Sequence, residues 1–349
     1  MATIVVCGGA GFIGANFVRY WLGAYPGDRV IVYDALTYAG NLPSLADLEG
    51  RYAFVRGDIG NLDLLVHLFE RERPTYVVNF AAESHNSRAL LDPAAFFRTN
   101  VLGTLALLQA VRDAGMPRFH HVSTCEVYGD LALDSPETFT EATPYDPKTP
   151  YNASKAAGDM AVRGMTHTFK LPATISICAN NYGPYQFPEK VIPFFTVRAL
   201  QGLPMPLYRS SANRREWLHA IDHCRAIDLI LRRGRIGETY NVGSGVELDV
   251  EQIADAIITT LGVSPSLRTY VEDRPGLDRR YLLDSSKIRQ ELGWKPTIEI
   301  GTGLPETIRW YQAHEAWWRP LLARLAVNEE AWKSREGTLT QPSPAGGRG

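Results

Sequence analysis

The strongest constraint on the fold is an alternation of short aliphatic runs with longer amphipathic stretches along the first half of the chain. The aliphatic runs predict strands at residues 3–7, 29–33, 53–56, 76–80, 118–123 and 173–179. The stretches between them predict helices at residues 13–20, 62–71, 96–114 and 151–168. Runs that are apolar on both faces suit a parallel sheet covered by helices on both sides, and such β-α-β units have right-handed crossovers. The predicted fold class is therefore α/β, with a doubly wound parallel sheet.

The pattern changes after Tyr182, where segments rich in proline and glycine separate shorter helices, predicted at 250–261 and 285–292. We expect residues 1–181 to form the sheet domain and residues 182–333 to form mainly a smaller C-terminal α/β substrate domain over its carboxyl edge. An apolar segment at 237–242 is a candidate for a strand that returns to the main sheet. Residues 334–349 are rich in Gly, Pro and Ser and are predicted to be a disordered tail.

A glycine-rich turn, Gly8-Gly9-Ala10-Gly11-Phe12-Ile13-Gly14, joins the first strand to the first helix. Glycines here let the backbone turn tightly and let a pyrophosphate approach the helix N-terminus, where free N–H groups and the helix dipole favour anions. Asp34 follows about 20 residues later, at the end of the second strand, where a carboxylate accepts hydrogen bonds from an adenosine ribose. It would repel a 2′-phosphate, so the sequence predicts a Rossmann-type domain that binds NAD. The predicted cofactor contacts from these motifs are Gly8, Gly11, Phe12, Ile13, Gly14 and Asp34, with Asp58 and Ile59 near the adenine.

Tyr151 and Lys155 stand four residues apart at the start of a predicted helix, after Pro150. They share one helix face, and an ammonium beside a phenol is expected to lower the pKa of the phenol and make it a usable proton acceptor. Thr124 or Ser123, at the end of the fifth strand, would supply a hydroxyl that shares the substrate's oxygen. Together these residues predict a site that takes a proton from a substrate hydroxyl, at which Tyr151 and Lys155 are also expected to contact the cofactor.

Composition narrows the classes of partner. A formal net charge of −2 leaves no basic surplus for nucleic acid or an anionic membrane. No uninterrupted apolar run approaches the roughly 18 residues of a membrane-spanning helix, and we expect a cytoplasmic protein. Cys7, Cys125, Cys178 and Cys224 lack the spacing of a disulfide framework or a zinc site. His219 and His223 stand four residues apart, but we expect them to pack or to cap a helix, so no metal is predicted.

These motifs together resemble the extended short-chain dehydrogenase/reductase family, and within it most closely the dTDP-glucose 4,6-dehydratases. The resemblance covers roughly residues 1–318 and rests on the segments DALTYAGN (34–41), AAESH (81–85), TCEVYG (124–129), NNYGPYQFPEK (180–190), REW (215–217) and DRPGLDRRY (273–281). It implies an NAD-retaining lyase of deoxysugar biosynthesis that acts on a nucleotide-activated hexose. The best single substrate is dTDP-glucose, and the product is dTDP-4-keto-6-deoxyglucose.

The resemblance also implies a role for each catalytic residue. Tyr151, assisted by Lys155 and Thr124, takes the proton of the sugar 4-hydroxyl while C4 gives hydride to NAD. Glu126 removes the C5 proton, which the new ketone acidifies, and the 6-hydroxyl leaves as water. Hydride then returns to C6 and a proton to C5, so the net reaction is a dehydration.

Cys125 stands where the family has the Asp that serves as general acid for the leaving hydroxyl. A thiol holds a proton at neutral pH but is a poorer donor than a neutral carboxylic acid. GDP-mannose dehydratases have Thr-Ser-Glu here and UDP-glucose 4-epimerases often have Thr-Cys-Ala, while 5,6-dehydratases return hydride to C4 and form an exocyclic alkene. A 4-epimerase, a 5,6-dehydratase and a catalytically silent nucleotide-sugar-binding or NAD-sensing protein therefore stay open, although Glu126 favours elimination.

The substrate contacts are likewise implied by the resemblance. Arg215 and Arg274 would bind the diphosphate, because paired guanidinium groups suit two phosphates. The other implied substrate residues are Ser84, His85, Asn181, Lys190, Pro206, Tyr208 and Asn241, and Ala81 is an implied cofactor contact. The chain departs from the family at Asn86-Ser87, where the family has Val-Asp, and at Leu277, where it has His. These departures leave the nucleotide base and the sugar open.

The family is commonly dimeric through a four-helix bundle with two helices from each subunit. The predicted helices at 96–114 and 151–168 match those helices in position. The resemblance therefore implies a homodimer.

Overall fold

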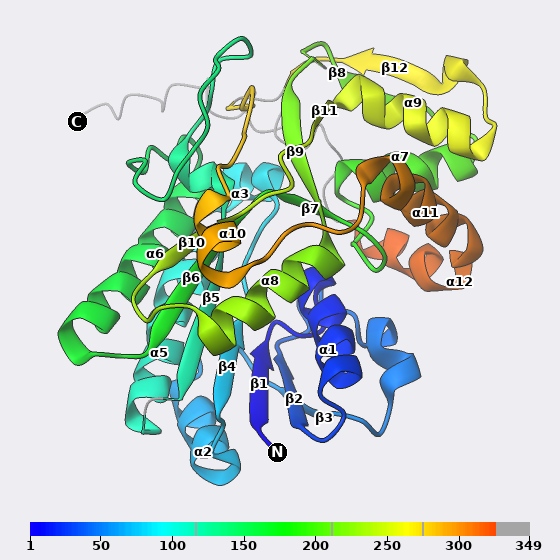
Figure 1. Cartoon of the computed structure of the whole chain (residues 1–349). Coiled ribbons are helices and arrows are strands. Elements are labelled where there is room, and N and C mark those ends of the chain that lie inside the picture. The colour runs from blue at the N-terminus through cyan, green and yellow to red at the C-terminus, as the bar shows by residue number, and fades with distance from the viewer. Residues whose placement is uncertain (116, 211, 274–275, 326–349) are drawn as a thin grey trace, which may run out of the picture.

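The computed structural model describes residues 1–115, 117–210, 212–273 and 276–325. Its centre is a seven-stranded sheet in the order β10-β6-β5-β4-β1-β2-β3, in which every neighbouring pair is parallel (Figure 1). The strands are β1 (Thr3–Cys7), β2 (Arg29–Asp34), β3 (Ala53–Arg56), β4 (Tyr76–Asn79), β5 (Arg118–Thr124), β6 (Ala173–Cys178) and β10 (Thr239–Val242). This arrangement confirms the predicted α/β class with a Rossmann-type parallel sheet.

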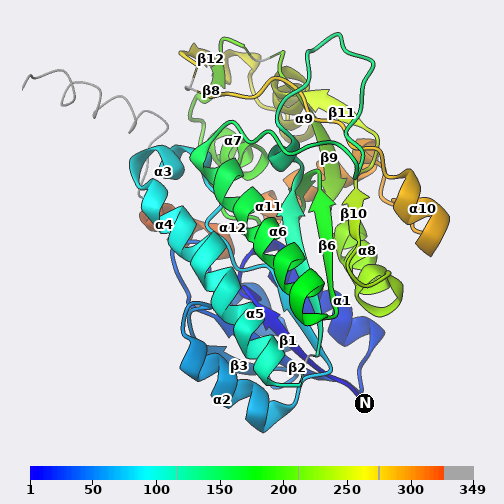
Figure 2. The same ribbon diagram turned by 90° about the vertical axis from the view of Figure 1, so that its left-hand side faces the viewer.

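Helices cover both faces of the sheet (Figure 2). On one face, α1 (Phe12–Ala24) packs against α8 (Ala220–Arg233); the other face carries α2 (Leu62–Glu72), α5 (Thr104–Asp113) and α6 (Pro150–Phe169). The strand side chains between them form the main core, in which residues such as Ile4, Val32 and Val77 have no exposed surface. Each such burial contributes about 1.5–3 kcal/mol, which explains why uninterrupted aliphatic runs become the central strands.

The predicted helix at 96–114 is confirmed as part of a continuous helical stretch, Pro93–Asp113, but this stretch contains a π turn that was not predicted. The structure has α4 (Pro93–Phe97), then one π-helical turn, η2 (Arg98–Gly103), and then α5. Asn100, within the π turn, accepts from the backbone N–H of Glu83 (2.9 Å) and donates to Ser154 Oγ (2.8 Å) on α6. This turn ties the helix to a loop beside the sheet, and apolar periodicity alone does not show such a tie.

Later segments form a smaller unit over the carboxyl ends of the central strands (Figure 1). Its strands are β7 (Asn180–Tyr182), β9 (Arg214–His219) and β11 (Glu247–Asp249) in one sheet and β8 (Met205–Tyr208) and β12 (Arg268–Val271) in another. Its helices are α7 (Val191–Leu200), α9 (Val250–Leu261), α11 (Ile300–Ala313) and α12 (Glu315–Trp318), whereas α10 (Ser286–Leu292) packs against β10 and α8 beside the main sheet. The remaining short helices and helical turns are η1 (Leu42–Leu48), α3 (Asn86–Leu91), η3 (Cys125–Tyr128), η4 (Pro265–Leu267) and η5 (Arg319–Arg324). The unit has a hydrophobic cluster of its own, which includes Phe195, Trp217 and Ile257.

Two elements from the second half of the chain belong to the main sheet. Strand β10, within the segment 237–242, pairs with β6 from Thr239–Ile175 to Val242–Cys178. Helix α8, which the sequence analysis did not predict, packs against α1, β5 and β6. The predicted tail at 334–349 lies outside the described residues.

Pro93–Asp113 is the one stretch in the described part of the chain that is long and apolar enough to cross a membrane, with a mean hydropathy of 1.3 over its window. The sequence analysis predicted no such stretch. Only the length and the composition of this stretch suggest a membrane span, and the core helix of a soluble protein can have the same length and composition. Leu107, Leu108, Ala110 and Val111 of this stretch are fully buried in the main core.

Candidate active site

The glycine turn after β1 leaves room that side chains would fill. Gly8 has a φ of +74°, and a Cβ on it would lie 2.5 Å from the backbone nitrogen of Ala81. A Cβ on Gly14 would meet the carbonyl oxygen of Gly8. Gly11 is the N-cap of α1 and brings no side chain to the free N–H groups of the first turn. The turn therefore fits the pyrophosphate of a dinucleotide.

Asp34 lies at the end of β2 beside this turn. Its Oδ2 accepts a hydrogen bond from the N–H of Ala10 (2.9 Å) and its Oδ1 accepts one from Leu36 (2.8 Å). Burial raises the pKa of the Asp34 carboxyl, while these two backbone hydrogen bonds oppose that rise. A cavity of about 100 Å³ is lined by Gly8, Gly11, Asp34, Asp58, Ile59 and Ala81, among others. This cavity has the acceptor and the shape to hold the adenosine of NAD.

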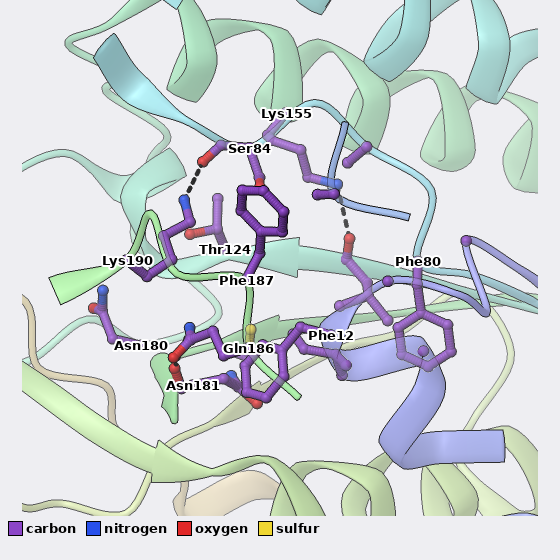
Figure 3. A pocket seen from close by; sticks show the side chains of 18 of the residues that line it. Phe12, Phe80, Ser84, Thr124, Lys155, Asn180, Asn181, Gln186, Phe187 and Lys190 are labelled. Carbon is purple, nitrogen blue, oxygen red and sulfur yellow. Dashed lines mark hydrogen bonds between the residues drawn. The ribbon is translucent and has the colours of Figure 1, made fainter. Parts of the chain in front are cut away.

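A second cavity, of about 260 Å³, adjoins the first and shares Gly8, Gly11 and Phe80 with it. Its lining includes Phe12, Ile13 and Gly14 from the glycine turn, Thr124 and Glu126 from the end of β5, and Tyr151 and Lys155 from α6. Ser84, Asn181 and Lys190 also line it (Figure 3). The structure thus gathers the four residues expected to oxidise and deprotonate a sugar around one space.

Tyr151 is positioned by the start of α6. Thr149 is the N-cap and accepts from the N–H of Asn152 (3.2 Å), and Pro150 occupies the first helical position. The pKa of the Tyr151 phenol is raised well above its ordinary value, first by burial and then by the charge of Glu126, while a hydrogen bond with Thr124 lowers it. The expected lowering by Lys155 is therefore wrong for this arrangement.

The ammonium of Lys155 is held by groups of β5. Its Nζ donates to the backbone oxygen of Val122 (2.8 Å; Figure 3) and lies 3.4 Å from Nε2 of His121. Asp159, one helical turn further along α6, has Oδ1 3.5 Å from the same imidazole nitrogen. Burial lowers the pKa of Lys155, and the charge of Asp159 opposes that shift. Asp159 therefore helps to keep the buried ammonium protonated.

Glu126 lies in the η3 turn directly after β5. The hydroxyl of Thr124 accepts from the Glu126 N–H (3.4 Å), which caps the turn and fixes the backbone of the carboxylate. Its Oε2 accepts a hydrogen bond from Nδ2 of Asn86 (3.1 Å). The side chain is thus a held carboxylate on the wall of the cavity that Tyr151 also lines.

Cys125, the third member of the predicted catalytic turn, points elsewhere. It is 1% exposed, belongs to the main hydrophobic cluster and is not among the residues that line the cavity. Burial raises the pKa of the thiol well above its ordinary value, and the charge of Glu126 adds to the rise. The thiol therefore keeps its proton at neutral pH.

Three of the predicted substrate residues line the cavity. Lys190 Nζ donates to the backbone oxygen of Ser84 (2.6 Å), so the two hold each other (Figure 3). Asn181 Nδ2 donates to the oxygen of Ala179 (2.9 Å), and its Oδ1 lies 3.0 Å from Nδ1 of His223. His223 is thereby a partner of Asn181, and His219 caps α8 by accepting from Ile221.

The cavity lining does not include the other predicted substrate residues that the structure describes, which are His85, Pro206, Tyr208, Arg215 and Asn241. Asn241 is fully buried in β10, where it donates to Phe139 O (2.9 Å) and accepts from Tyr128 OH (2.9 Å). Its amide is committed to the packing of the sheet, which corrects the expected substrate contact.

Arg215 lies in β9, and His85 directly precedes α3. The Arg215 guanidinium binds the backbone oxygens of Arg279 (3.1 Å) and Asp278 (2.5 Å) and lies over the Tyr281 ring. His85 caps α3. Arg274 lies outside the described residues.

Several lining residues were missed by the sequence analysis. They are Phe80, Asn180, Gln186, Phe187 and Glu189. Four of them belong to the segment 180–190, in which Gly183 (φ 145°) and Tyr185 (φ 69°) bend the chain over the cavity. The Gly183-Pro184 pair in this segment was the available signal for such a bend.

Comparisons with known proteins identify the family of the chain. Residues 5–307 match the protein family described as GDP-mannose 4,6 dehydratase. A dTDP-glucose 4,6-dehydratase from Xanthomonas campestris pv. campestris is 48% identical over 337 residues, which cover 91% of this chain and 95% of that protein.

Solved structures give the same result. A dTDP-glucose 4,6-dehydratase from Streptomyces venezuelae with NAD bound has a TM-score of 0.88 and 46% identity over 91% of this chain and 99% of that one. A UDP-glucose 4-epimerase from Thermotoga maritima has a TM-score of 0.83 at 28% identity, over 89% of this chain and 99% of that one. On its sequence, its sheet and its cavity, this chain belongs to the GDP-mannose 4,6-dehydratase family of the extended short-chain dehydrogenases/reductases.

Proposed function

We propose that the chain is an NAD-dependent dTDP-glucose 4,6-dehydratase, a hydro-lyase that converts dTDP-glucose to dTDP-4-keto-6-deoxyglucose and water. Relatives of that name are 46–48% identical over 91% of the chain. The observation that carries the proposal is that Glu126 lines the same cavity as Tyr151, Lys155 and Thr124. An epimerase that acts through C4 alone needs only the last three residues, whereas a dehydratase also needs a base for C5.

The first half of the reaction uses the hydroxyl of Thr124, at the end of β5, and the hydroxyl of Tyr151, at the start of α6. Tyr151 accepts the proton of the sugar 4-hydroxyl in its ionised form, and Thr124, which hydrogen-bonds the phenol, steadies the oxygen as it loses that proton. The positive charge that NAD⁺ would bring to the cavity favours this ionised form and would oppose the effect of burial on the pKa of the phenol. When bound, NAD supplies the hydride acceptor for C4 and later the hydride donor for C6. The glycine turn would hold its pyrophosphate, and Asp34 would hold its adenosine ribose.

The second half uses Glu126. The C4 ketone acidifies the C5–H bond, so Glu126 can take that proton while the C6–O bond breaks and hydroxide leaves. Water forms when this hydroxide takes up one proton, which balances the proton that Tyr151 took from the 4-hydroxyl. Glu126 then returns its proton to C5. We place the nucleotide diphosphate between the cavity and Arg215, in the unit formed mainly by residues 182–333. Ser84, Asn181 and Lys190 would contact the substrate between these two points.

Turnover of dTDP-glucose tests the proposal directly. The product should show the alkali-induced ultraviolet absorbance of a 4-keto-6-deoxy sugar and the mass loss of one water. In deuterated water, elimination through C5 incorporates solvent deuterium there, whereas epimerisation by hydride return to C4 does not. A 5,6-dehydratase would instead give an exocyclic alkene. Silence with dTDP-, UDP- and GDP-hexoses alike, together with tight NAD binding, would support a binding protein and contradict the proposal.

Cys125→Asp is expected to give no faster loss of water than the wild type, because residue 125 lies in the main hydrophobic cluster and does not line the cavity. A faster loss of water would show that a side chain at this position does reach the leaving hydroxyl. Single-turnover decay of the reduced cofactor measures this step. Cys125→Ser, which adds no stronger acid, is the control and should show no gain. A large fall in kcat for Cys125→Asp would mean that the thiol has a specific task.

We propose that the protein is a homodimer that uses the surface of α4, η2 and α6, which lie side by side with α5 (Figure 2). This surface exposes Phe97 (41%), Leu102 (61%) and Met160 (46%). The double substitution Leu102→Glu with Met160→Glu is expected to weaken association about 100-fold or more, because burying unpaired carboxylates costs several kcal/mol. Light scattering after size-exclusion chromatography measures the mass. Ile236→Glu, at an exposed apolar site elsewhere, should leave the dimer intact; a monomeric wild type would contradict the proposal.

We also propose a cytoplasmic location. Cys7, Cys125, Cys178 and Cys224 are all free thiols. Free thiols persist where the compartment is reducing.

A further inference from the structure

Asn86 lies directly against the carboxylate assigned as the C5 base. Its Nδ2 donates to Oε2 of Glu126 (3.1 Å), and its Oδ1 accepts from the hydroxyl of Thr149 (3.1 Å). The same Thr149 hydroxyl accepts from the N–H of Asn152 as the cap of α6, so its single hydrogen is free to point at Asn86. This chain of contacts fixes which end of the Asn86 amide faces Glu126.

The ionisable groups around Glu126 make the hydrogen bond from Asn86 important for the position of its carboxylate. The pKa of the Asp278 carboxyl and the pKa of the Tyr281 phenol are both raised, first by burial and second by the charge of Glu126. Tyr151 is affected in the same way. A like-charged neighbour such as Asp278 repels the Glu126 carboxylate and does not hold it in one rotamer, whereas a neutral amide donor does.

We propose that Asn86 is a positioning residue for Glu126: it holds Oε2 so that Oε1 faces the C5 proton of the substrate. This inference rests on the proposed dehydratase function. Asn86 is also one of the positions at which the chain departs from the pattern of the family it resembles, where Val stands and no donor is present. The hydrogen bond that holds Glu126 therefore depends on a residue that is particular to this chain.

A purely structural role for Asn86 would have a different signature. Asn86 opens α3, which packs against α6, so loss of its contacts could loosen both helices and slow every step alike. A positioning role affects only the step that Glu126 performs. Oxidation at C4, which uses Tyr151 and Lys155, is therefore an internal control within each variant.

The experiment compares Asn86→Val and Asn86→Asp with wild type in single turnovers of dTDP-glucose. Val removes the donor, and Asp replaces it with a second carboxylate against Glu126. We expect reduced cofactor to form at the wild-type rate and then to decay about 10-fold more slowly for Val and about 100-fold more slowly for Asp, with KM unchanged. Slower exchange of C5–H with deuterated water should accompany the slower decay.

Asp249→Ala is the control for stability, because it removes the capping box of α9, remote from the cavity. Its thermal unfolding temperature should fall while its turnover stays at the wild-type value. Unchanged decay in Asn86→Val, or formation and decay slowed equally in both Asn86 variants, would overturn the proposal. If Asn86→Asp does not fold, the Val variant alone decides. A wild-type protein that does not dehydrate dTDP-glucose would refute the proposed function, which is a separate result.

Discussion

Glu126→Gln is expected to oxidise dTDP-glucose at C4 and then to stop with its cofactor reduced. Glutamine keeps the size of the side chain and can still contact Asn86, but it cannot accept the C5 proton. Overall turnover should therefore fall about 100-fold to 10,000-fold, the usual contribution of a general base. Oxidation should continue, because Tyr151, Lys155 and Thr124 are untouched and lie on other parts of the cavity wall.

Stopped-flow absorbance of the reduced cofactor measures the two phases separately. The wild type should show a rise and a decay, whereas Glu126→Gln should show the rise alone. Glu126→Asp, which keeps the base on a shorter arm, should restore part of the decay. Loss of the rise together with the decay would contradict the role assigned to Glu126, because that role begins only after C4 is a ketone.

Tyr151→Phe is expected to lose both phases. Phenylalanine fills the same space beside Phe96, with which Tyr151 packs edge to face, so the helix should keep its place. It has no oxygen to take the 4-hydroxyl proton or to meet Thr124, so C4 oxidation should slow about 100-fold to 10,000-fold. No reduced cofactor should accumulate, because the first step limits the rate.

NAD content after purification and the thermal unfolding temperature should stay at wild-type values in Tyr151→Phe, which separates lost chemistry from lost folding. Tyr20→Phe is a matched control: its hydroxyl binds Asp228 on α8, on the far side of the sheet. That variant should turn over normally. A rise in reduced cofactor at the wild-type rate in Tyr151→Phe would mean that another group takes the proton.

The main sheet could be predicted from the sequence because its strands are continuous aliphatic runs. The runs at 3–7 and 53–56 match β1 and β3, and the others end within one residue of the observed strands. The π turn at Arg98–Gly103 could not be predicted, since it depends on Asn100 meeting Glu83 and Ser154 across the fold. Helix α8 was missed because its start is capped by a histidine, His219, which is not a usual N-cap residue.

The site was predictable where a local motif imposes the chemistry. The glycine turn, Asp34 and the Tyr151–Lys155 pair follow from spacing on one strand or one helix. What the sequence could not give is the environment of these groups. The pKa of Tyr151 depends on burial and on Glu126, and Lys155 turns toward Val122 and His121. The contact between Asn86 and Glu126 could not be predicted, because α3 and η3 are separated along the chain and only the fold brings them together.

The path of the chain limits how such a protein can be cut or recombined. It leaves the large sheet after β6, returns with α8 and β10, and leaves again with β11. A fragment that ends at residue 181 would expose the unpaired edge of β6 and the surface of α1 that α8 covers, which makes it prone to aggregate. Exchange of the sugar-binding part between relatives as a single C-terminal cassette would therefore replace structural members of the cofactor half as well. A working chimera needs junctions on both sides of α8 and β10.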